Sequence, residues 1–475
     1  MLTSRDLGPP SGGRRPHAPL LGALLGALLG AQFALPHAVR AQGSEQPEVF
    51  LEIHKRDAFR VPLVIEDFAD AEVSAAWGER ALMPDGQRVE DVLGQDLMLT
   101  DAFVVARERA GGGADPGLRT DMEGDLVDRA IQARIVGRLT LRGADVWLAA
   151  ELRDEGSGTR ILAEEYRLSA PEEPRRLDRW GLHRLTDAVL RHLIGTPGCA
   201  ATRIACVRAS GAHKELFLID WDGRQAEPLT ELGSIIVCPA WHPARPELAF
   251  VSYHRGMPAL LRMNLEDRSV YTLSDGGTPG AVAYARDGAR IAFSSTREGN
   301  AELYVARHDG SHARRVTYHD GIDTAPSWSP RGDRIVFTSD RCGNPQLFLI
   351  DADGSDLQQL TFWGRWNDSP DWSPLSDRIV HVCRIDGEFE LALIDASGFG
   401  WRRLTVGGGC EDPSWAPDGR HIVFARMQNG ARSLWIVDSE TGRLRRLTAA
   451  RSQTYNPAWS SPLPERIRAS GSDGG

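Results

Sequence analysis

The second half of the chain repeats one short pattern with a nearly constant period. An aromatic residue marks each copy, and successive markers lie 43 or 44 residues apart. A period in the low forties is typical of four-stranded propeller blades and also of helical HEAT or armadillo arrays. The repeat therefore limits the fold to two kinds of architecture. The markers are Trp241, Tyr284, Trp328, Trp372, Trp415 and Trp459.

Turn residues decide between these two architectures. In the copy that begins at Trp328, short runs rich in β-branched, aromatic and leucine residues alternate with the turns P-R-G-D, C-G-N and D-G. Glycine supplies the positive φ that tight hairpins need, and a helix of ten residues would not tolerate glycine and proline at this density. Each copy therefore predicts four antiparallel strands, which form a β-propeller blade.

The number of blades follows from the two ends of the repeat. Five complete copies begin at the first five markers, whereas Trp459 is followed by too little chain for more than a first strand. Upstream, the segment Thr202–Thr230 supplies a second, third and fourth strand without a first. We expect the Trp459 strand to pair with this segment, which closes a ring of six blades and leaves no free sheet edge.

The residues between the N-terminal region and the repeat indicate a separate small domain. Strands are expected at 61–68, 131–142, 145–154 and 161–168, a loop at 107–118, and a long helix at 175–194. Val89, Val92, Leu93 and Leu97 share one face of another predicted helix, over 89–97. The predicted fold class is thus a small α/β N-terminal domain followed by an all-β six-bladed β-propeller.

The first forty residues have the features of a secretory signal. Arg14 and Arg15 precede a short apolar stretch, and Val39 and Ala41 are the small residues that signal peptidase requires. An uncleaved membrane anchor is the alternative, although the apolar stretch is shorter than the span of about 20 apolar residues that a membrane needs. We expect cleavage after Ala41 and a periplasmic location. The predicted segments are a signal peptide 1–41, a first domain with an extended arm 42–195, a linker 196–200, a propeller 201–464 and a disordered tail 465–475.

Composition and motifs exclude several classes of function. The net charge of −10 argues against a nucleic-acid partner. The six cysteines include no C-x-x-C pair, so no metal site is expected, although Cys199–Cys206 and Cys238–Cys410 disulfides stay open. No G-x-S-x-G nucleophile elbow is present. We therefore predict no catalytic residues and no cofactor.

The pair of domains resembles the TolB family, the periplasmic propeller proteins of the Tol–Pal envelope system. The likeness rests on R-V-P-L-V-I-E-D-F, on V-E-D-V-L-G-Q-D-L, on the helix and linker L-H-R-L-T-D-A-V-L-R-H-L-I-G-T-P-G, and on T-R-I-A-C-V. The resemblance implies a non-catalytic protein that binds the peptidoglycan-associated lipoprotein Pal, and other outer-membrane lipoproteins, at the propeller mouth. It also implies that the N-terminal arm contacts inner-membrane TolA, and that the protein is monomeric alone and reaches membranes only through partners. The six cysteines and the charged arm depart from the family pattern.

Candidate partner-binding residues lie on the loops that enter the innermost strand of each blade. Trp366 and Tyr455 are candidate anchors, because aromatic side chains bury much area on binding; packing against neighbouring blades is the alternative. The acidic residues would either form an anionic rim or cap turns. A secreted propeller that binds a carbohydrate or peptide is the alternative function. The predicted mouth residues are His319, Asp320, Asp323, Trp366, Asn367, Asp368, Glu411, Asp412, Tyr455 and Asn456, and the predicted arm residues are Glu48, Val49, Phe50, Leu51, Glu52 and Ile53.

Overall fold

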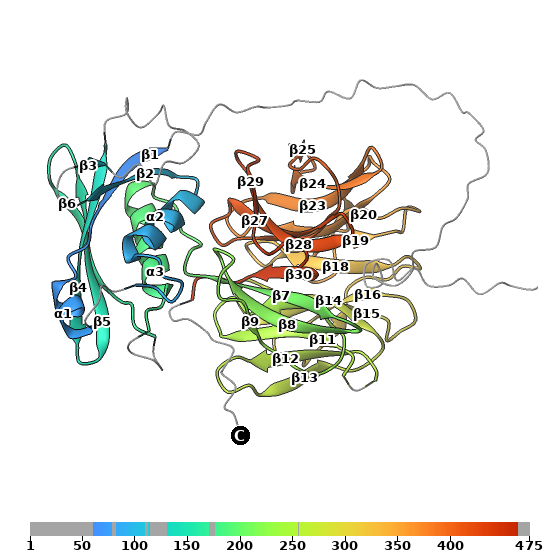
Figure 1. Cartoon of the computed structure of the whole chain (residues 1–475). Coiled ribbons are helices and arrows are strands. Elements are labelled where there is room, and N and C mark those ends of the chain that lie inside the picture. Colours follow the sequence, from blue (N-terminus) through green and yellow to red (C-terminus); the bar gives the residue numbers. More distant parts are fainter. Residues whose placement is uncertain are drawn as a thin grey trace, which may run out of the picture. The chain divides into compact units, whose positions relative to one another are not determined.

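The repeated half of the chain forms a closed six-bladed β-propeller, as its period predicts (Figure 1). The computed structural model describes residues 60–77, 82–109, 113–114, 131–170, 176–254 and 256–463. Within these ranges, six four-stranded antiparallel sheets form the blades. Their innermost strands contact one another in order, and the last also contacts the first, so the ring is complete.

Each blade runs from an innermost to an outermost strand. Blade 1 contains β10 (Ile236–Trp241), β11 (Glu247–Ser252), β12 (Ala259–Asn264) and β13 (Val270–Ser274); blade 2 contains β14 (Pro279–Tyr284), β15 (Arg290–Ser295), β16 (Glu302–Arg307) and β17 (Arg314–Arg315). Blade 3 contains β18 (Asp323–Trp328), β19 (Arg334–Ser339), β20 (Gln346–Asp351) and β21 (Gln358–Gln359). Blade 4 contains β22 (Asn367–Trp372), β23 (Arg378–Ile385), β24 (Glu388–Asp395) and β25 (Arg402–Arg403); blade 5 contains β26 (Cys410–Trp415), β27 (His421–Gln428), β28 (Ala431–Asp438) and β29 (Leu444–Arg446).

Blade 6 combines the two ends of the propeller. Its innermost strand is β30 (Thr454–Trp459), followed by β7 (Arg203–Ser210), β8 (His213–Asp220) and β9 (Glu227–Pro228). Strand β30 pairs antiparallel with β7, with Trp459 opposite Ile204. The predicted closure is therefore confirmed, and the ring cannot open without breaking the pairing of a whole strand.

The marker tryptophans hold neighbouring blades together. All five are at most 8% exposed. The indole N–H of Trp415 donates to the backbone carbonyl of Asp371 at 3.0 Å, and that of Trp241 donates to the carbonyl of Ala458 at 3.0 Å. The second of these bonds links blade 1 to blade 6. The repeated tryptophans thus pack within the ring, and all five also line its central cavity.

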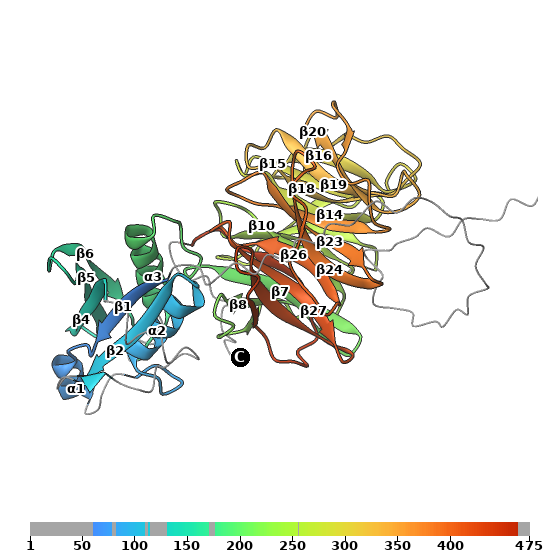
Figure 2. The same cartoon turned by 90° about the horizontal axis from the view of Figure 1, so that it is seen from above.

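The first domain is a six-stranded mixed sheet with strand order β3-β2-β1-β4-β5-β6. Strand β1 is parallel to both neighbours, and the other pairs are antiparallel. Helices α2 and α3 pack against each other and lie on one face of the sheet, whereas α1 packs against β4 (Figure 2). The elements are β1 (Val61–Glu66), α1 (Ala71–Trp77), α2 (Val89–Leu99), β2 (Phe103–Arg109), β3 (Gly113–Ala114), β4 (Ala133–Arg142), β5 (Asp145–Asp154), β6 (Arg160–Arg167) and α3 (Trp180–Leu193).

The apolar helix face predicted in this domain is confirmed. Val89, Val92, Leu93 and Leu97 are at most 1% exposed and join a single core with the sheet and with α3. This core needs both helices, because each covers a different part of the sheet: α2 packs against β2 and α3 packs against β6.

Parts of the first domain differ from the sequence prediction. The long helix starts at Trp180 and not at 175, because Leu177 forms a β-bridge with Ser169 and the Asp178 carboxylate accepts the N–H of Trp180 at 2.7 Å. Residues 107–109, expected in a loop, end β2, since 107 and 108 pair with β1. The sequence prediction also missed α1 and β3, which are too short to show a clear period, and it assigned no strand to residues 103–106 of β2.

Several predicted features lie outside the described residues, namely the signal peptide, the arm residues 48–53 and the tail. In the part of the chain that the structure describes, no helix has the length and apolar character needed to cross a membrane. All six cysteines are free thiols, so neither of the two disulfides left open by the sequence is present.

Candidate partner-binding site

A buried hydrogen-bond motif anchors the mouth loops, which lead from the outermost strand of one blade to the innermost strand of the next. Thr317, Thr361 and Thr405 start three such loops and are at most 3% exposed. Each hydroxyl donates at 2.6–2.7 Å to a buried Glu or Gln side chain of the same blade and accepts a backbone N–H at 2.9 Å. Fully satisfied buried polar groups of this kind hold the loop in one conformation.

The residue after each anchoring threonine is exposed and apolar. Tyr318, Phe362 and Val406 are 73%, 75% and 70% exposed. They lie 44 residues apart, so they occupy the same position on three consecutive mouth loops. We call these three residues the apolar arc. Exposed apolar groups that gather on one face are typical of protein interaction sites.

A second group of mouth residues lies where blades 5 and 6 meet. The Arg432 guanidinium donates to both carboxylate oxygens of Glu411 at 2.8 and 2.9 Å. Tyr455 has two cations over its ring, with Arg432 at 5.1 Å and the Lys214 ammonium at 4.7 Å from the centroid. Two of the predicted mouth residues, Glu411 and Tyr455, therefore belong to one cluster, and Tyr455 also packs against the core between blades 6 and 1.

Asp412 and Asn456 occupy equivalent positions on adjacent innermost strands. Both have left-handed backbones, with φ of 49° and 40°, at a bulge where the pairing with the next strand shifts. The Asn456 amide donates to the Asp412 carboxylate at 2.7 Å. Burial, with Glu411 and Asp368 nearby, raises the pKa of Asp412 to about 7. This carboxyl group therefore titrates close to neutral pH.

Asp323 and Asn367 are fully buried and do not face the mouth. Asp323 accepts from the Arg341 guanidinium at 2.7 Å, and the Asn367 amide donates to Gln346 at 3.0 Å. Each begins an innermost strand, and Asp323 is bonded to its own blade, whereas Asn367 is bonded to the preceding blade. Asp368 is half-buried, and burial raises the pKa of its carboxyl group.

The other predicted mouth residues are more accessible but do not form one cluster. His319 and Asp320 are exposed on the loop after Tyr318, where His319 Nδ1 accepts the backbone N–H of Gly321 at 2.9 Å. Trp366 is half-buried, and its ring meets the ring of Phe389 edge-on at 5.8 Å. Trp366 thus packs against a residue of its own blade 4, whereas the alternative given by the sequence was packing against neighbouring blades.

The central channel contains a cavity of about 310 Å³. It runs from the left-handed residues to the prolines that follow the tryptophans, away from the mouth loops. Asp371 lines this cavity, accepts the hydroxyl of Ser327 at 2.9 Å and accepts the backbone N–H of Trp415 at 2.7 Å. Burial raises the pKa of Asp371 to about 6.

The described residues offer two groups of side chains suited to a metal ion, and neither contains a predicted mouth residue. One group is Cys199, Asp418 and His421, and the other is Asp101, His421 and Asp438. The first group also does not have the geometry of a catalytic triad. Cys199 Sγ and Asp418 Oδ2 both face Nδ1 of His421, at 4.0 and 2.6 Å, whereas a triad uses the two different ring nitrogens.

Comparison with known proteins identifies the family. The family model of the TolB β-propeller domain matches residues 190–463. This chain belongs to the TolB propeller family. Two of the curated relatives are the Tol-Pal system protein TolB of Anaeromyxobacter dehalogenans strain 2CP-C, 32% identical over 265 residues, and the TolB homolog of Chlorobium luteolum, 29% identical over 286 residues. These alignments cover 54% and 59% of this chain and 58% and 62% of the relatives' own lengths.

A solved TolB structure has the same fold over a longer range. The crystal structure of TolB from Acinetobacter baumannii superposes with a TM-score of 0.70 and covers 86% of this chain and 98% of the crystallised one, at 24% identity. The fold class expected from the sequence, a small α/β domain followed by a six-bladed propeller, is therefore confirmed.

Proposed function

We propose that this chain is a non-catalytic periplasmic scaffold of the Tol–Pal system. In this proposal the propeller mouth binds the peptidoglycan-associated lipoprotein Pal, and the arm residues 48–53 bind TolA in the inner membrane. Membership of the TolB propeller family and the names of the matched relatives support the system. The linkage of envelope layers would support outer-membrane integrity and constriction at cell division, as the resemblance implies.

The apolar arc is the observation that carries the docking role of the mouth. Its three side chains are about three-quarters exposed, although two of them are aromatic. Their loops are held by buried threonine contacts, so binding would order little additional chain. Rigid exposed aromatic side chains are the typical anchors of protein interfaces.

Charged groups beside the arc would orient the partner. Asp320 lies on the loop that enters β18, and Glu411 is the second residue of β26, where Arg432 holds it. Such fixed charges act on encounter rates and register more than on affinity. A partner whose contact surface presents apolar side chains flanked by basic residues would fit this mouth.

Export and the role of the arm belong to the same proposal. The signal peptide with cleavage after Ala41, the domain limits and the arm contact remain predictions, because residues 1–59 lie outside the described part of the chain. Deletion of residues 42–57 is expected to abolish TolA binding and to leave Pal binding nearly unchanged, since the mouth loops all lie within the propeller, between β9 and β30.

Co-purification from detergent-solubilised envelopes tests the proposal. A tagged chain is expected to recover a lipoprotein with a peptidoglycan-binding domain, identified by mass spectrometry. Retention on glycan beads without any lipoprotein would instead support the alternative, a secreted propeller that binds carbohydrate. The repeated tryptophans are at most 8% exposed, so they would offer little aromatic face for stacking on a sugar.

A further inference from the structure

A cysteine and a histidine that are far apart in sequence meet in the core between blades 5 and 6. Cys199 Sγ lies 4.0 Å from Nδ1 of His421, and 222 residues separate the two. Cys199 is 2% exposed and His421 is 3% exposed. Asp418 Oδ2 lies 2.6 Å from the same nitrogen. All three candidate ligand atoms fall within 4.8 Å of one another.

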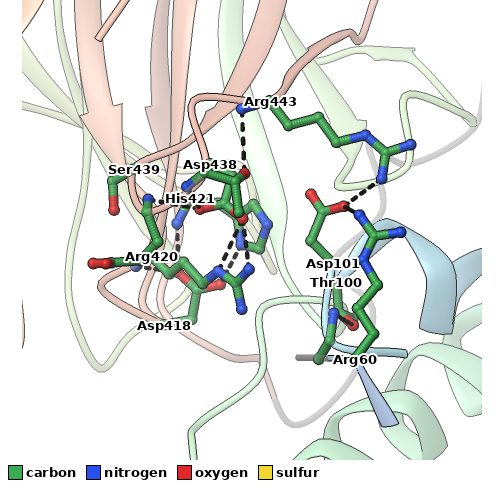
Figure 3. A network of polar contacts seen from close by, with 12 residues as sticks. Arg60, Thr100, Asp101, Asp418, Arg420, His421, Asp438, Ser439 and Arg443 are labelled. Atoms are coloured by element: carbon green, nitrogen blue, oxygen red, sulfur yellow. Dashed lines mark hydrogen bonds and ion pairs between the residues drawn. The ribbon is translucent and has the colours of Figure 1, made fainter. Parts of the chain in front are cut away.

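The backbone around each residue is fixed by hydrogen bonds. The Asp187 carboxylate accepts the N–H groups of Ala200 and Ala201 at 2.8 and 2.9 Å, directly after Cys199. In the first hairpin of blade 5, Asp418 Oδ1 accepts the N–H groups of Arg420 and His421 at 2.8 and 3.0 Å (Figure 3). The thiol, the imidazole and the carboxylate therefore converge without further chain movement.

The Asp418–His421 contact alone would be only a turn feature. In blade 2, Asp287 and Arg290 occupy the same hairpin positions and form an ion pair at 2.7 Å. Blade 5 differs in two ways: its basic residue is an imidazole, which can bind a metal, and a buried thiol lies beside it. The turn does not account for the thiol, and Nε2 of His421 is buried with no hydrogen-bond partner among the described residues.

We propose that Cys199, Asp418 and His421 form a zinc site with three protein ligands. Thiolate sulfur, imidazole nitrogen and carboxylate oxygen are the donors that Zn²⁺ takes in tetrahedral sites, at about 2.3 Å for sulfur and about 2.0 Å for nitrogen and oxygen. The charge of Zn²⁺ would be balanced by one thiolate and one carboxylate. Water would complete the tetrahedron.

Binding requires small movements and the loss of two protons. The Cys199 thiol and the His421 imidazolium that pairs with Asp418 each release one proton to solvent. The imidazole keeps its proton on Nε2 and stays neutral, and the lone pairs of Sγ and Nδ1 bind the metal. In tetrahedral zinc, neighbouring ligand atoms lie about 3.5 Å apart, so the Sγ–Nδ1 distance of 4.0 Å must shorten and the Asp418–His421 distance of 2.6 Å must lengthen. Rotation of the Asp418 carboxyl group about its terminal bond lengthens this distance, and it weakens the bonds that Oδ1 accepts from Arg420 and His421.

His421 also provides a route for the ion. It lines a cavity of about 480 Å³ whose walls include Asp438, Ile436 and Arg445. Neither Cys199 nor Asp418 lines the cavity, so an approach from solvent would reach the site at the imidazole. Aspartates and four arginines share its wall, so its charge does not by itself attract a cation.

The second group at His421 is a weaker candidate. Its carboxylates are already engaged, since Asp438 accepts from Arg420 at 2.6 and 3.0 Å and Asp101 accepts from Arg443 at 2.6 Å (Figure 3). A cation there would have to displace both arginines. The Cys199 group has no arginine of this kind on Asp418 among the described contacts.

Zinc and cobalt binding to the purified exported chain test the site. After equilibration with Zn²⁺ and exhaustive dialysis, the wild type is expected to retain one zinc per chain by elemental analysis. Co²⁺ is expected to give a thiolate-to-cobalt charge-transfer absorption. Cys199→Ser is expected to lose this band and to bind zinc at least tenfold more weakly. Cys206→Ser is the matched control, because Cys206 is fully buried in the same core and belongs to neither metal group.

Two results would overturn the site. The first is a wild-type chain that retains no zinc, or whose cobalt complex lacks the thiolate band; this result does not depend on any variant folding. The second is equal zinc binding by wild type and a Cys199→Ser variant with an unchanged circular dichroism spectrum. Neither result bears on lipoprotein binding at the mouth, so the two proposals fail separately.

Discussion

Replacing Trp459 by phenylalanine removes one hydrogen-bond donor at the seam of the ring while keeping an aromatic side chain. The indole N–H donates to the Thr202 hydroxyl at 2.7 Å and joins β30 to the segment that leads into β7. Thr202 is fully buried, so the lost bond is not replaced by water. A buried hydrogen bond that is left unmade costs about 1–3 kcal/mol, and the smaller ring leaves an additional cavity.

Trp372→Phe is the matched control for the cavity. Trp372 holds the same position in blade 4 and is 5% exposed, compared with 7% for Trp459. Its indole N–H is buried and has no hydrogen-bond partner among the described residues. The two variants therefore lose the same side-chain volume, but only Trp459→Phe loses a bond. We expect Trp459→Phe to reduce the free energy of unfolding by about 1–2 kcal/mol more than Trp372→Phe does.

Urea unfolding followed by far-ultraviolet circular dichroism measures this difference, because the signal does not depend on tryptophan fluorescence. The urea dependence of the unfolding free energy should stay unchanged while the midpoints separate. Equal midpoints for the two variants, or a lower midpoint for Trp372→Phe, would refute the role assigned to the seam hydrogen bond.

Two further predictions concern buried titrating groups. His381 is fully buried, and burial lowers its pKa in the folded chain to about 4. In the unfolded chain the pKa returns to the ordinary value of about 6.5, so the unfolded chain binds more protons when the pH is below 6.5. The contribution of the neutral His381 to the free energy of unfolding is therefore fully present above pH 6.5 and is expected to fall by about 3 kcal/mol as the pH drops to 4. His381→Phe should flatten this pH dependence. An unchanged pH dependence in the variant would contradict the lowered pKa of His381. For Asp371, whose pKa is raised to about 6, the folded chain binds more protons between about pH 4 and 6, so stability falls as the pH rises through this range. Asp371→Asn keeps an acceptor for the backbone N–H of Trp415. It should raise the free energy of unfolding, measured by denaturant titration, by about 1–2 kcal/mol at pH 8 and leave it unchanged at pH 4. A lower free energy of unfolding at pH 8 would show that the charge itself is needed.

The ring could be predicted from sequence because its determinants are local and repeated. Glycine and proline set each turn, and the constant spacing of the tryptophans sets the size of the blade. The closure followed from an incomplete copy at each end. The start of the long helix could not be predicted, because Leu177 is drawn into a β-bridge with Ser169, a contact that the local pattern does not reveal.

The mouth was less predictable, because residue type does not determine exposure. Asp323 and Asn367 are polar but fully buried, whereas Tyr318 and Phe362 are aromatic but about three-quarters exposed. The exposure of the aromatic residues depends on the preceding threonine, whose buried hydroxyl fixes the loop. The recurrence of an apolar residue after threonine every 44 residues was the available signal.

The zinc site could not be predicted from spacing. Cys199 and His421 are not close in sequence, and neither belongs to a metal-binding motif. Only the closed ring brings the linker beside blade 5. Sites of this kind depend on tertiary structure, so a sequence motif is not expected.

The affinity of the purified Pal lipoprotein for single-site variants tests the docking role of the mouth most directly. Phe362, in the apolar arc, and Phe399 are matched, being 75% and 77% exposed. Phe399 follows β24 in the turn to β25, at the opposite end of blade 4 from the loops that enter the innermost strands, because successive strands alternate in direction. By isothermal titration calorimetry, we expect Phe362→Ser to weaken binding at least tenfold, about 1.4 kcal/mol, and Phe399→Ser to stay within about twofold of the wild type. Equal affinities for all three proteins, or a larger loss for Phe399→Ser, would contradict the account.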